Sequence, residues 1–293
     1  MNPFQTQFPN ILEKEPLSKH CTYNIGGPAD FFYNLENIEE LPDLIETAKK
    51  NSIKYLIIGH GTNILFPDKG FNGLVIKITA QNIEKKDAKV SVEAGLKLSQ
   101  LIKYLKDNNL TGMESLAGVP GTVGGGVYGN CGAFGTTISD FIETVTFYNK
   151  KNGKIEEKPK DSCKFSYRYS IFKDTKDVVL KVTFQFKEAE KETITEKLDD
   201  ILAKRKEGFV SGFSCGSFFK NPNNDLKAGY LVDKAGCKGL QVGDAQVSLK
   251  NANYILNIGK ATQKDILELA EIVKEKVKHK FEVELEEEVQ IIR

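Results

Sequence analysis

Two glycine-containing segments of the sequence have the residue types of phosphate-binding loops. In GHGTNIL (59–65), Gly59 and Gly61 allow a turn that presents consecutive backbone N–H groups to a phosphate oxygen, and Thr62 and Asn63 add side-chain hydrogen bonds. The pattern is not the dinucleotide fingerprint of a Rossmann fold, because that motif needs a third glycine. An ordinary tight turn is the alternative interpretation.

The second segment, AGVPGTVGGGVYGNCGAFG (117–135), carries the stronger signal. Residues 112–135 include nine glycines among 24 residues, which is too many for an ordinary helix or strand. Pro120 fixes a turn, and the backbone is uncovered at Gly121, Gly124, Gly125 and Gly126. Two such segments in one domain suggest a pyrophosphate site, and a crowded crossing between packed elements is the alternative.

An arginine and a serine lie in unusual surroundings. Arg168 stands among aromatic and apolar residues in DSCKFSYRYSIF (161–172), where a guanidinium is poorly solvated unless it binds a carboxylate or phosphate or forms a structural ion pair. Ser217 is followed closely by Lys220 and Asn221 in SCGSFFKNP. None of the three histidines stands in a hydrolase motif, so we do not expect a nucleophile, and a turn residue is the alternative.

The C-terminal segment FEVELEEEVQIIR (281–293) alternates as a strand does. This alternation turns Glu288 to the polar face and leaves Glu287 on the apolar face, where a bulge or a cavity would explain it. Successive carboxylates near an active site would raise one another's pKa. A solvated terminal strand is the alternative.

The composition restricts the class of protein. A chain of 293 residues forms about two domains, and its formal net charge of +1 provides no overall field for nucleic acid or an anionic membrane. The five cysteines include no C-x-x-C pair, so we predict neither a disulfide framework nor a metal site. No signal-peptide pattern or long apolar run is present, and we therefore expect a cytoplasmic protein without membrane insertion.

Alternating helices and strands must position these segments. We predict a helix capped by Asn37, strands at 54–59, 73–78, 89–95, 144–150 and 178–187, and helices from 98, over 187–207, over 225–235 and from 263. Further strands are predicted at 242–248, 253–257 and the C-terminus. The chain is thus expected to be α+β, with an N-terminal segment at 1–20 and domains at 21–188 and 189–293.

Seven segments in order resemble the motifs of the UDP-N-acetylenolpyruvoylglucosamine reductase family, and seven together are highly specific. They are TYNIGGPADFF (22–32), GHGTNIL, AGVPGTVGGGVYGNCGAFG, YRYSIF (167–172), GSFFKNP (216–222), AGYLVDKAGCKGLQVGDAQVS (228–248) and LEEEV (285–289). The chain departs from the family where KEGFVSG follows Arg205 and where KNANY stands at 250–254. The short spacing after YRYSIF resembles the compact second type of the family.

The resemblance implies a fold and a cofactor. The fold is an FAD-binding domain of the vanillyl-alcohol-oxidase (PCMH) type with two α+β subdomains at 21–188, followed by a smaller α+β substrate-binding domain at 189–293. The cofactor is non-covalent FAD, with NADPH as the hydride donor. The implied cofactor-binding residues are Gly59, Gly61, Thr62, Asn63, Gly118, Pro120, Gly121, Thr122, Gly124 and Gly125.

The resemblance also implies an activity, the reduction of UDP-N-acetylglucosamine enolpyruvate to UDP-N-acetylmuramate in peptidoglycan precursor synthesis. Hydride passes from reduced FAD to C3, Ser217 protonates C2, and Arg168 and Glu288 stabilise the developing charge. The implied substrate-binding residues are Tyr167, Lys220 and Asn221. We expect a monomer. Another FAD-dependent oxidase or dehydrogenase of this fold, or a non-catalytic nucleotide-sugar-binding paralogue, is the alternative.

Overall fold

The structure is a computed structural model that describes residues 2–223 and 225–293. The chain forms two compact units. Unit 1 consists of Met1–Leu12, Phe31–His60 and Gly73–Glu207, and unit 2 consists of Glu13–Asp30, Gly61–Asn72 and Gly208–Arg293. Each unit has a hydrophobic core of its own.

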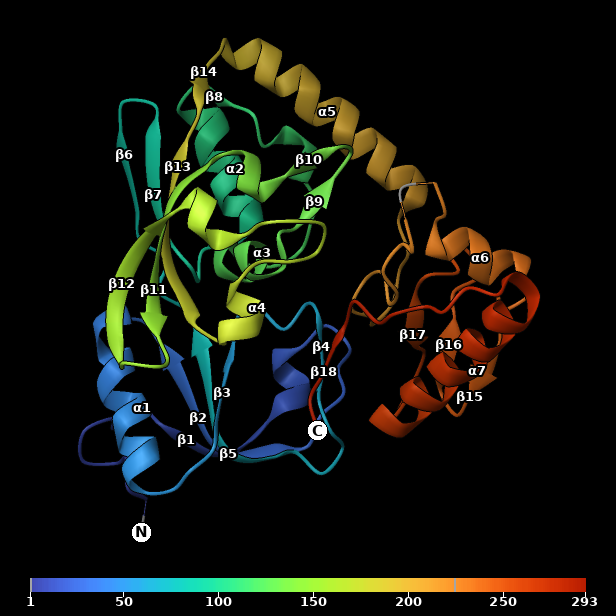
Figure 1. The fold of residues 1–293 in the computed structure, drawn as a ribbon, viewed down its shortest axis with the longest axis horizontal. Coiled ribbons are helices and arrows are strands. Elements are labelled where there is room, and N and C mark those ends of the chain that lie inside the picture. Colours follow the sequence, from blue (N-terminus) through green and yellow to red (C-terminus); the bar gives the residue numbers. More distant parts are fainter. Residues whose placement is uncertain (1, 224) are drawn as a thin grey trace. The chain divides into compact units, whose positions relative to one another are not determined.

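The elements are distributed along the whole chain (Figure 1). The helices are α1 (Leu41–Lys50), α2 (Leu98–Asp107), α3 (Val123–Gly129), α4 (Phe172–Thr175), α5 (Lys191–Gly208), α6 (Ala228–Lys234) and α7 (Gln263–Phe281). The strands are β1 (Leu12–Pro16), β2 (Pro28–Leu35), β3 (Tyr55–Ile58), β4 (Ile64–Leu65), β5 (Phe71–Ile78), β6 (Ile83–Lys86), β7 (Lys89–Glu93), β8 (Leu110–Thr111), β9 (Gly132–Ala133), β10 (Thr136–Thr137), β11 (Ile142–Asn149), β12 (Lys154–Pro159), β13 (Val178–Gln185), β14 (Lys187–Glu188), β15 (Gln241–Val242), β16 (Ala245–Val247), β17 (Ile255–Asn257) and β18 (Gln290–Ile291).

Helix α1 and the strand pair β3–β5 form one part of unit 1. The side chain of Asn37 accepts a hydrogen bond of 3.1 Å from the Glu39 N–H at the start of the helical region, as the sequence predicts. The apolar face of α1 is fully buried and consists of Leu41, Leu44, Ile45 and Ala48. Strands β3 and β5 pair in parallel within a sheet of order β1-β2-β5-β3, and Ile58 lies opposite Lys77.

A five-stranded antiparallel sheet of order β12-β11-β13-β7-β6 forms the other part of unit 1. Helix α2 buries the side that the helical spacing predicts, which is Leu98, Leu101, Ile102 and Leu105. Helix α3 packs on β13 and β7. This sheet and its helices therefore carry the glycine-rich segment, which includes α3 and β9.

The glycine-rich segment is helical at 123–129, so the prediction that it holds too many glycines for a helix is wrong. The reason is close packing. A Cβ on Gly124 would stand 2.6 Å from the Cβ of Ala94, and one on Gly126 would stand 3.0 Å from the Sγ of Cys131. At these two positions glycine lets α3 approach its neighbours, as the crossing alternative proposes.

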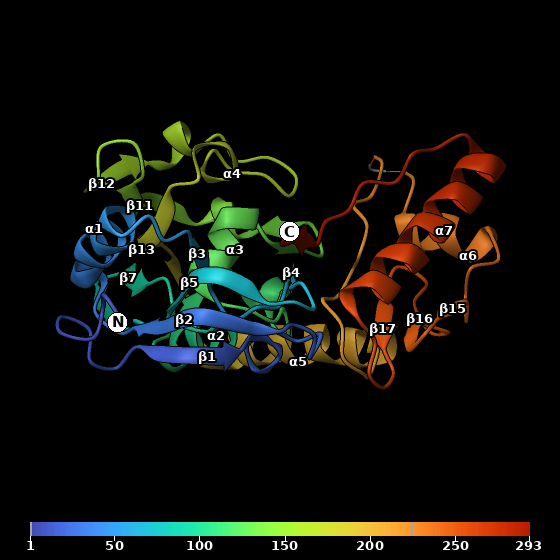
Figure 2. The same ribbon diagram turned by 90° about the horizontal axis from the view of Figure 1, so that it is seen from below.

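Unit 2 contains a three-stranded sheet of order β15-β16-β17, on which α7 packs with α6 beside it (Figure 2). The Oγ1 of Thr262 accepts a hydrogen bond of 3.1 Å from the Asp265 N–H and caps α7. The buried face of α7 includes Ile266, Ala270, Val273 and Val277, as predicted.

The C-terminal strand is shorter than the predicted one. The described pairing is confined to β18, which runs parallel to β4, and to an isolated antiparallel bridge between Phe219 and Glu287. The C-terminal strand is interrupted because its pairing partner changes. Glu287 pairs with Phe219, whereas Gln290 and Ile291 pair with β4. The chain thereby joins three segments of unit 2 that are distant in sequence.

The compact units and the predicted domains divide the chain differently. Residues 13–30 and 61–72 belong to unit 2, and α5 lies in unit 1 except for its last residue, with Ile194 and Leu198 buried. The domain assignment of 21–188 to FAD and 189–293 to substrate stays a prediction, since a compact unit is defined by packing and not by the ligand that it binds.

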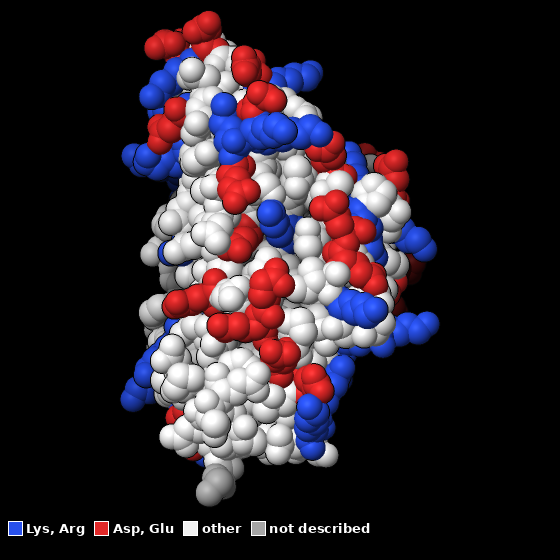
Figure 3. Space-filling view, turned by 90° about the vertical axis from the view of Figure 1, so that its left-hand side faces the viewer, with Lys and Arg blue, Asp and Glu red and all other residues white. Residues whose placement is uncertain are grey.

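The described helices include none with the length and apolar character needed to cross a membrane. Acidic and basic side chains lie among one another on the face drawn in Figure 3. This mixture of charges agrees with the formal net charge of +1.

Candidate active site

The site residues expected from the sequence are found in both units. Unit 1 carries Gly59, Gly118, Pro120, Gly121, Thr122, Gly124, Gly125, Tyr167 and Arg168. Unit 2 carries Gly61, Thr62, Asn63, Ser217, Lys220, Asn221 and Glu288.

The two glycine segments meet in unit 1. A Cβ on Gly59 would stand 2.7 Å from the Oγ1 of Thr122, and this Oγ1 also accepts a hydrogen bond of 3.4 Å from the Gly125 N–H. Gly59 directly follows β3, whereas Thr122 precedes α3. Two segments that the sequence separates by some sixty residues therefore converge, as a common pyrophosphate site requires.

The glycines of this region divide into exposed and packed positions. Gly118 has a φ of +78° and is exposed, and Gly125 is exposed with only Thr122 near its missing side chain, at 3.5 Å. Gly124 is buried against Ala94. The exposed backbone at Gly125 fits a large ligand such as FAD. Glycine at 59, 118 and 124 instead allows close approach by Thr122, Arg205 and Ala94.

Arg205 lies against the same region, although the sequence indicates it only as a departure from the family pattern. Its Nη2 donates a hydrogen bond of 3.3 Å to the Ser115 carbonyl, and its guanidinium lies 5.3 Å from the ring centroid of Phe134. A Cβ on Gly118 would stand 2.7 Å from its Cδ. Arg205 therefore covers part of the glycine segment from α5.

Arg168 occupies a strained turn. Ser166 and Tyr169 exchange two backbone hydrogen bonds of 3.1 Å, which makes Tyr167 and Arg168 the two central residues of a tight turn. Arg168 has a φ of +54°, a left-handed conformation that costs a side chain other than glycine roughly 1 kcal/mol or more. Strain of this kind concentrates at functional positions, which supports a role for Arg168 beyond packing.

Several contacts join this turn to the glycine segment. The Asn130 Nδ2 donates a hydrogen bond of 2.9 Å to the Ser166 carbonyl, and the Arg168 Nη1 donates one of 3.5 Å to the Gly132 carbonyl. The guanidinium also lies 5.3 Å from the ring centroid of Tyr167, which is 54% exposed. The structure thus brings two of the expected residues, Tyr167 and Arg168, to the end of α3.

Ser217 and Glu288 lie on paired segments of unit 2. The Glu288 N–H donates a hydrogen bond of 2.8 Å to the Phe218 carbonyl, and the Lys220 N–H donates one of 2.8 Å to the Glu286 carbonyl. These bonds flank the bridge between Phe219 and Glu287. Glu288 is therefore hydrogen-bonded through its backbone to Phe218, the residue that follows the expected serine, Ser217.

Asn63, which directly precedes β4, holds the glutamate segment. Its Nδ2 donates a hydrogen bond of 3.1 Å to the Glu288 carbonyl, and its own carbonyl accepts one of 3.0 Å from the Gln290 N–H. The sequence predicts Asn63 as a cofactor contact. The structure gives it a second task, which is to fix the backbone of Glu288.

Asn253 holds the serine segment from the other side, and sequence reasoning missed it. Its buried side chain accepts a hydrogen bond of 3.0 Å from the Phe219 N–H and donates one of 2.9 Å to the Phe219 carbonyl. Its carbonyl accepts a further bond of 2.7 Å from the Phe218 N–H. The amide thus takes the place of a neighbouring strand, and the asparagine at 253 in KNANY gives no signal of this in the sequence.

Three other expected residues also have structural contacts. The Nζ of Lys220 lies 3.0 Å from the Oε2 of Glu286, and the Oδ1 of Asn221 accepts a hydrogen bond of 3.0 Å from the Ala228 N–H at the start of α6. Gly61 has a φ of +71°, and a Cβ there would stand 2.0 Å from the carbonyl oxygen of His20. Glycine is therefore required at position 61 by the fold itself.

The acidic C-terminal segment corrects one expectation. Glu287 requires neither a bulge nor a cavity, because its Oε1 lies 2.5 Å from the Nζ of Lys274 on α7. Burial raises the pKa of Glu287, but the hydrogen bond and charge of Lys274 outweigh it and leave that pKa lowered. The hydrogen bond from Lys278 lowers the pKa of Glu284. For Glu287, one of the three successive carboxylates, the lysine partner on α7 thus reverses the expected upward shift.

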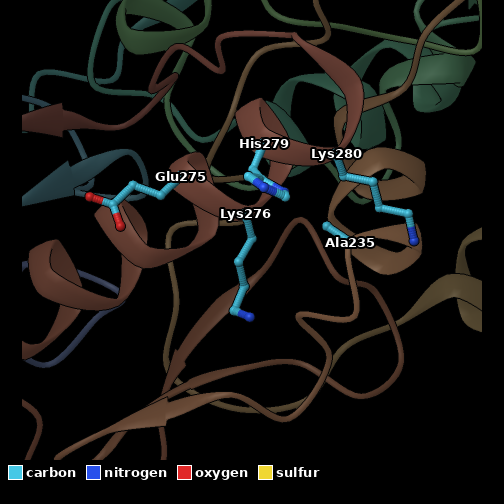
Figure 4. Close-up of a pocket in the computed structure, with 5 residues that line it drawn as sticks. All are labelled: Ala235, Glu275, Lys276, His279 and Lys280. Carbon is cyan, nitrogen blue, oxygen red and sulfur yellow. The ribbon is translucent and has the colours of Figure 1, made fainter.

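A separate open depression in unit 2 is lined by Ala235, Glu275, Lys276, His279 and Lys280. Figure 4 shows that the side chains of Glu275, Lys276 and Lys280 point in different directions. The residues that line this depression include none of the expected site residues. Within the described part of the chain, no three metal-ligating side chains cluster as a metal ion would need.

Comparison with known families defines the class of protein first. Residues 29–157 match the model of the FAD binding domain, and residues 209–292 match that of the UDP-N-acetylenolpyruvoylglucosamine reductase C-terminal domain. The chain is therefore a flavoprotein with an FAD-binding domain of the vanillyl-alcohol-oxidase type, and the predicted α+β fold class is confirmed.

Full-length relatives then define the family. A UDP-N-acetylenolpyruvoylglucosamine reductase of Listeria innocua is 38% identical over 100% of this chain and 99% of its own, and one of Latilactobacillus sakei is 39% identical over 97% and 93%. The crystal structure of the enzyme of this name from Thermus caldophilus matches with a TM-score of 0.82 at 32% identity, covering 96% of this chain and 98% of that one. The chain belongs to the UDP-N-acetylenolpyruvoylglucosamine reductase family.

Proposed function

We propose that this chain reduces UDP-N-acetylglucosamine enolpyruvate to UDP-N-acetylmuramate with electrons from NADPH, as the names of its relatives suggest. It acts as a monomer in the cytoplasm and supplies peptidoglycan precursor for cell-wall growth and cell shape. Assignment to the compact second type agrees with the short passage from α4 to β13, which leaves only residues 176 and 177 between them.

The observation that carries the proposal is the pairing of the Ser217 and Glu288 segments, which lie far apart in the sequence and share backbone hydrogen bonds. A hydroxyl and a carboxyl held this way suit the protonation of a carbon atom next to a carboxylate. The exposed backbone at Gly125 suits the cofactor. When bound, FAD supplies hydride transfer between NADPH and the enolpyruvyl double bond.

Ser217 donates its hydroxyl proton to C2 as the new C–H bond forms, a general-acid step worth about 10² to 10⁴ in rate. Arg168 binds the substrate carboxylate through two guanidinium N–H groups, and this contact contributes roughly 3 to 4 kcal/mol if it strengthens as charge develops. Glu288 hydrogen-bonds to the same carboxyl group. Tyr167, Lys220 and Asn221 contact the nucleotide-sugar.

The first test is whether the yellow purified protein consumes NADPH only when UDP-N-acetylglucosamine enolpyruvate is added. Another flavoprotein oxidase would ignore this substrate, and a non-catalytic paralogue would consume no NADPH. The Ser217→Ala variant should keep FAD and its reduction by NADPH but lose reoxidation by substrate. An unchanged steady-state rate in that variant would remove Ser217 from the mechanism.

A further inference from the structure

A half-buried lysine lies beside the first glycine segment in unit 1. Lys77, on β5, stands opposite Ile58, the last residue of β3. The chain continues from Ile58 into Gly59 and His60, so the parallel register places Lys77 next to the start of the proposed phosphate-binding turn. Nothing in the sequence pattern alone indicates this, because Lys77 reads as a polar residue within an otherwise apolar strand.

A second lysine lies beside the other glycine segment. Lys97 forms an antiparallel bridge with Thr122, and this bridge is flanked by hydrogen bonds of 3.0 Å from the Leu98 N–H to the Gly121 carbonyl and of 2.8 Å from the Val123 N–H to the Leu96 carbonyl. The segment that carries Lys97 is also joined to the end of β5, where the Gly95 N–H donates a hydrogen bond of 2.8 Å to the Ala80 carbonyl. The backbone therefore fixes both lysines around one junction.

The three basic groups at this junction act on one another. Burial lowers the pKa of Lys77, and the charge of Lys97 lowers it further. Burial likewise lowers the pKa of His60, followed by the charges of Lys77 and Lys97. Like charges that face the partly buried Lys77 and His60 oppose folding, and an anion bound among them would offset this repulsion.

We propose that Lys77 and Lys97, with the imidazole of His60 beside them, bind the diphosphate of FAD. The inference rests on the match of residues 29–157 to the FAD binding domain and deepens the function proposed above. Diphosphate oxygens are the chemistry that fits, since the two glycine segments meet at the same junction, where the exposed backbone of Gly125 lies close behind Thr122. NADPH and the uridine diphosphate of the substrate carry the same chemistry, and the test separates these sources.

The test compares FAD with riboflavin, which has the same ring system but no phosphate. The full-length protein is freed of flavin, and the dissociation constant of each ligand is measured by flavin fluorescence quenching. Lys97→Gln and Lys77→Gln should each weaken FAD binding roughly tenfold or more, the scale of one charge-assisted hydrogen bond, and leave riboflavin binding unchanged. Lys97→Arg should retain most of the affinity. Raising the salt concentration should weaken FAD binding to the wild type more than to the double variant.

Lys103→Gln provides the matched control, because Lys103 lies on the exposed side of α2 with its Nζ 2.6 Å from Asp107. It should leave both dissociation constants unchanged. Since Lys97 is exposed, Lys97→Gln should fold, and its flavin-free form should unfold at no lower temperature than the wild type. This stability measurement separates a lost charge from a damaged fold.

Two results would overturn the inference. One is FAD affinity in the double variant within about twofold of the wild type, or an equal loss for riboflavin. The other is unchanged FAD affinity together with a higher KM for NADPH or for the substrate, which would assign the lysines to that ligand. If FAD binding depends on the lysines but no NADPH is consumed with UDP-N-acetylglucosamine enolpyruvate, the proposed function fails and the lysine site stands.

Discussion

Removal of the Asn253 amide is expected to loosen the segment that carries Ser217. In Asn253→Ala, the Phe219 N–H and carbonyl lose partners at 3.0 and 2.9 Å. A buried backbone group without a partner costs about 1 to 3 kcal/mol, and water that enters the space left by the amide recovers part of this. We therefore expect a loss of about 2 to 4 kcal/mol in the free energy of unfolding.

The loss is measured by urea denaturation of the FAD-bound protein followed by circular dichroism. Hydrogen exchange read by mass spectrometry should show faster exchange in peptides that cover 214–222 and 285–290. Asn51→Ala is the matched control, since the exposed Asn51 amide donates one hydrogen bond of 2.8 Å to the Thr47 carbonyl, and its loss should stay within about 0.5 kcal/mol.

The kinetic consequence follows from the same contacts. The turnover number for enolpyruvate reduction should fall in Asn253→Ala, whereas FAD affinity should not, because Asn253 contacts only the segment near Ser217 among the expected site residues. A stability loss below about 1 kcal/mol, or unchanged exchange in these peptides, would refute the reasoning that the amide replaces a strand.

Three further predictions follow from single contacts. Lys274→Met leaves the partly buried Glu287 without its lysine partner and should lower the free energy of unfolding by about 1 to 2 kcal/mol at neutral pH. The lowered pKa of Glu287 stabilises the wild type only while this carboxylate is ionised. In urea titrations, the difference in stability between wild type and variant should therefore shrink as the pH falls below the ordinary pKa of 4.5. A difference that grows in acid would contradict this. Arg168→Gly accepts the φ of +54° and should be about 1 kcal/mol more stable than Arg168→Ala by thermal unfolding, while both lose activity; equal stabilities would mean that the turn carries no strain. Burial raises the pKa of Cys163 to about 11 and that of Cys215 further still, so iodoacetamide at pH 8 should modify both thiols only after unfolding, and labelling of Cys215 in the native protein would show that the segment before Ser217 opens.

The regular helices of this protein follow from the sequence because their apolar spacing is local. Helices α1, α2 and α7 bury the faces that a period of 3.6 residues selects, and the caps at Asn37 and Thr262 use side chains within a few residues of the helix start. Helix α3 does not follow from the sequence. Its glycines are explained by neighbours such as Ala94, whose position depends on the sheet and not on the local sequence.

The candidate site likewise has features that the local sequence predicts and features that depend on non-local packing. Residue types and motif order identify Arg168, Ser217 and Glu288, but their supports come from non-local pairing. Lys77 lies at the junction of the glycine segments because β5 pairs with β3. Asn253 contacts Phe219 from the connection between β16 and β17. The sequence shows which side chains are present, whereas the topology determines which buried backbone groups require a hydrogen bond from one of them.

Asn63 shows how one side chain can serve both a ligand and the fold. Its amide nitrogen is engaged by the Glu288 carbonyl at 3.1 Å, whereas an asparagine side chain also has a carbonyl oxygen and a second N–H. A contact with FAD and the support of Glu288 are therefore compatible. Asn63→Asp separates them, because it keeps an acceptor oxygen and loses the donor to Glu288.

We expect Asn63→Asp to lower the turnover number, because a carboxylate next to the Glu288 carbonyl repels that carbonyl and shifts Glu288 away from the substrate carboxyl group. FAD affinity should change less than in Asn63→Ala if the side-chain oxygen accepts a hydrogen bond from the cofactor. Both quantities are measured on the same preparations by steady-state kinetics and flavin fluorescence. Normal turnover in Asn63→Asp would show that the hydrogen bond to Glu288 does not determine the position of its carboxyl group.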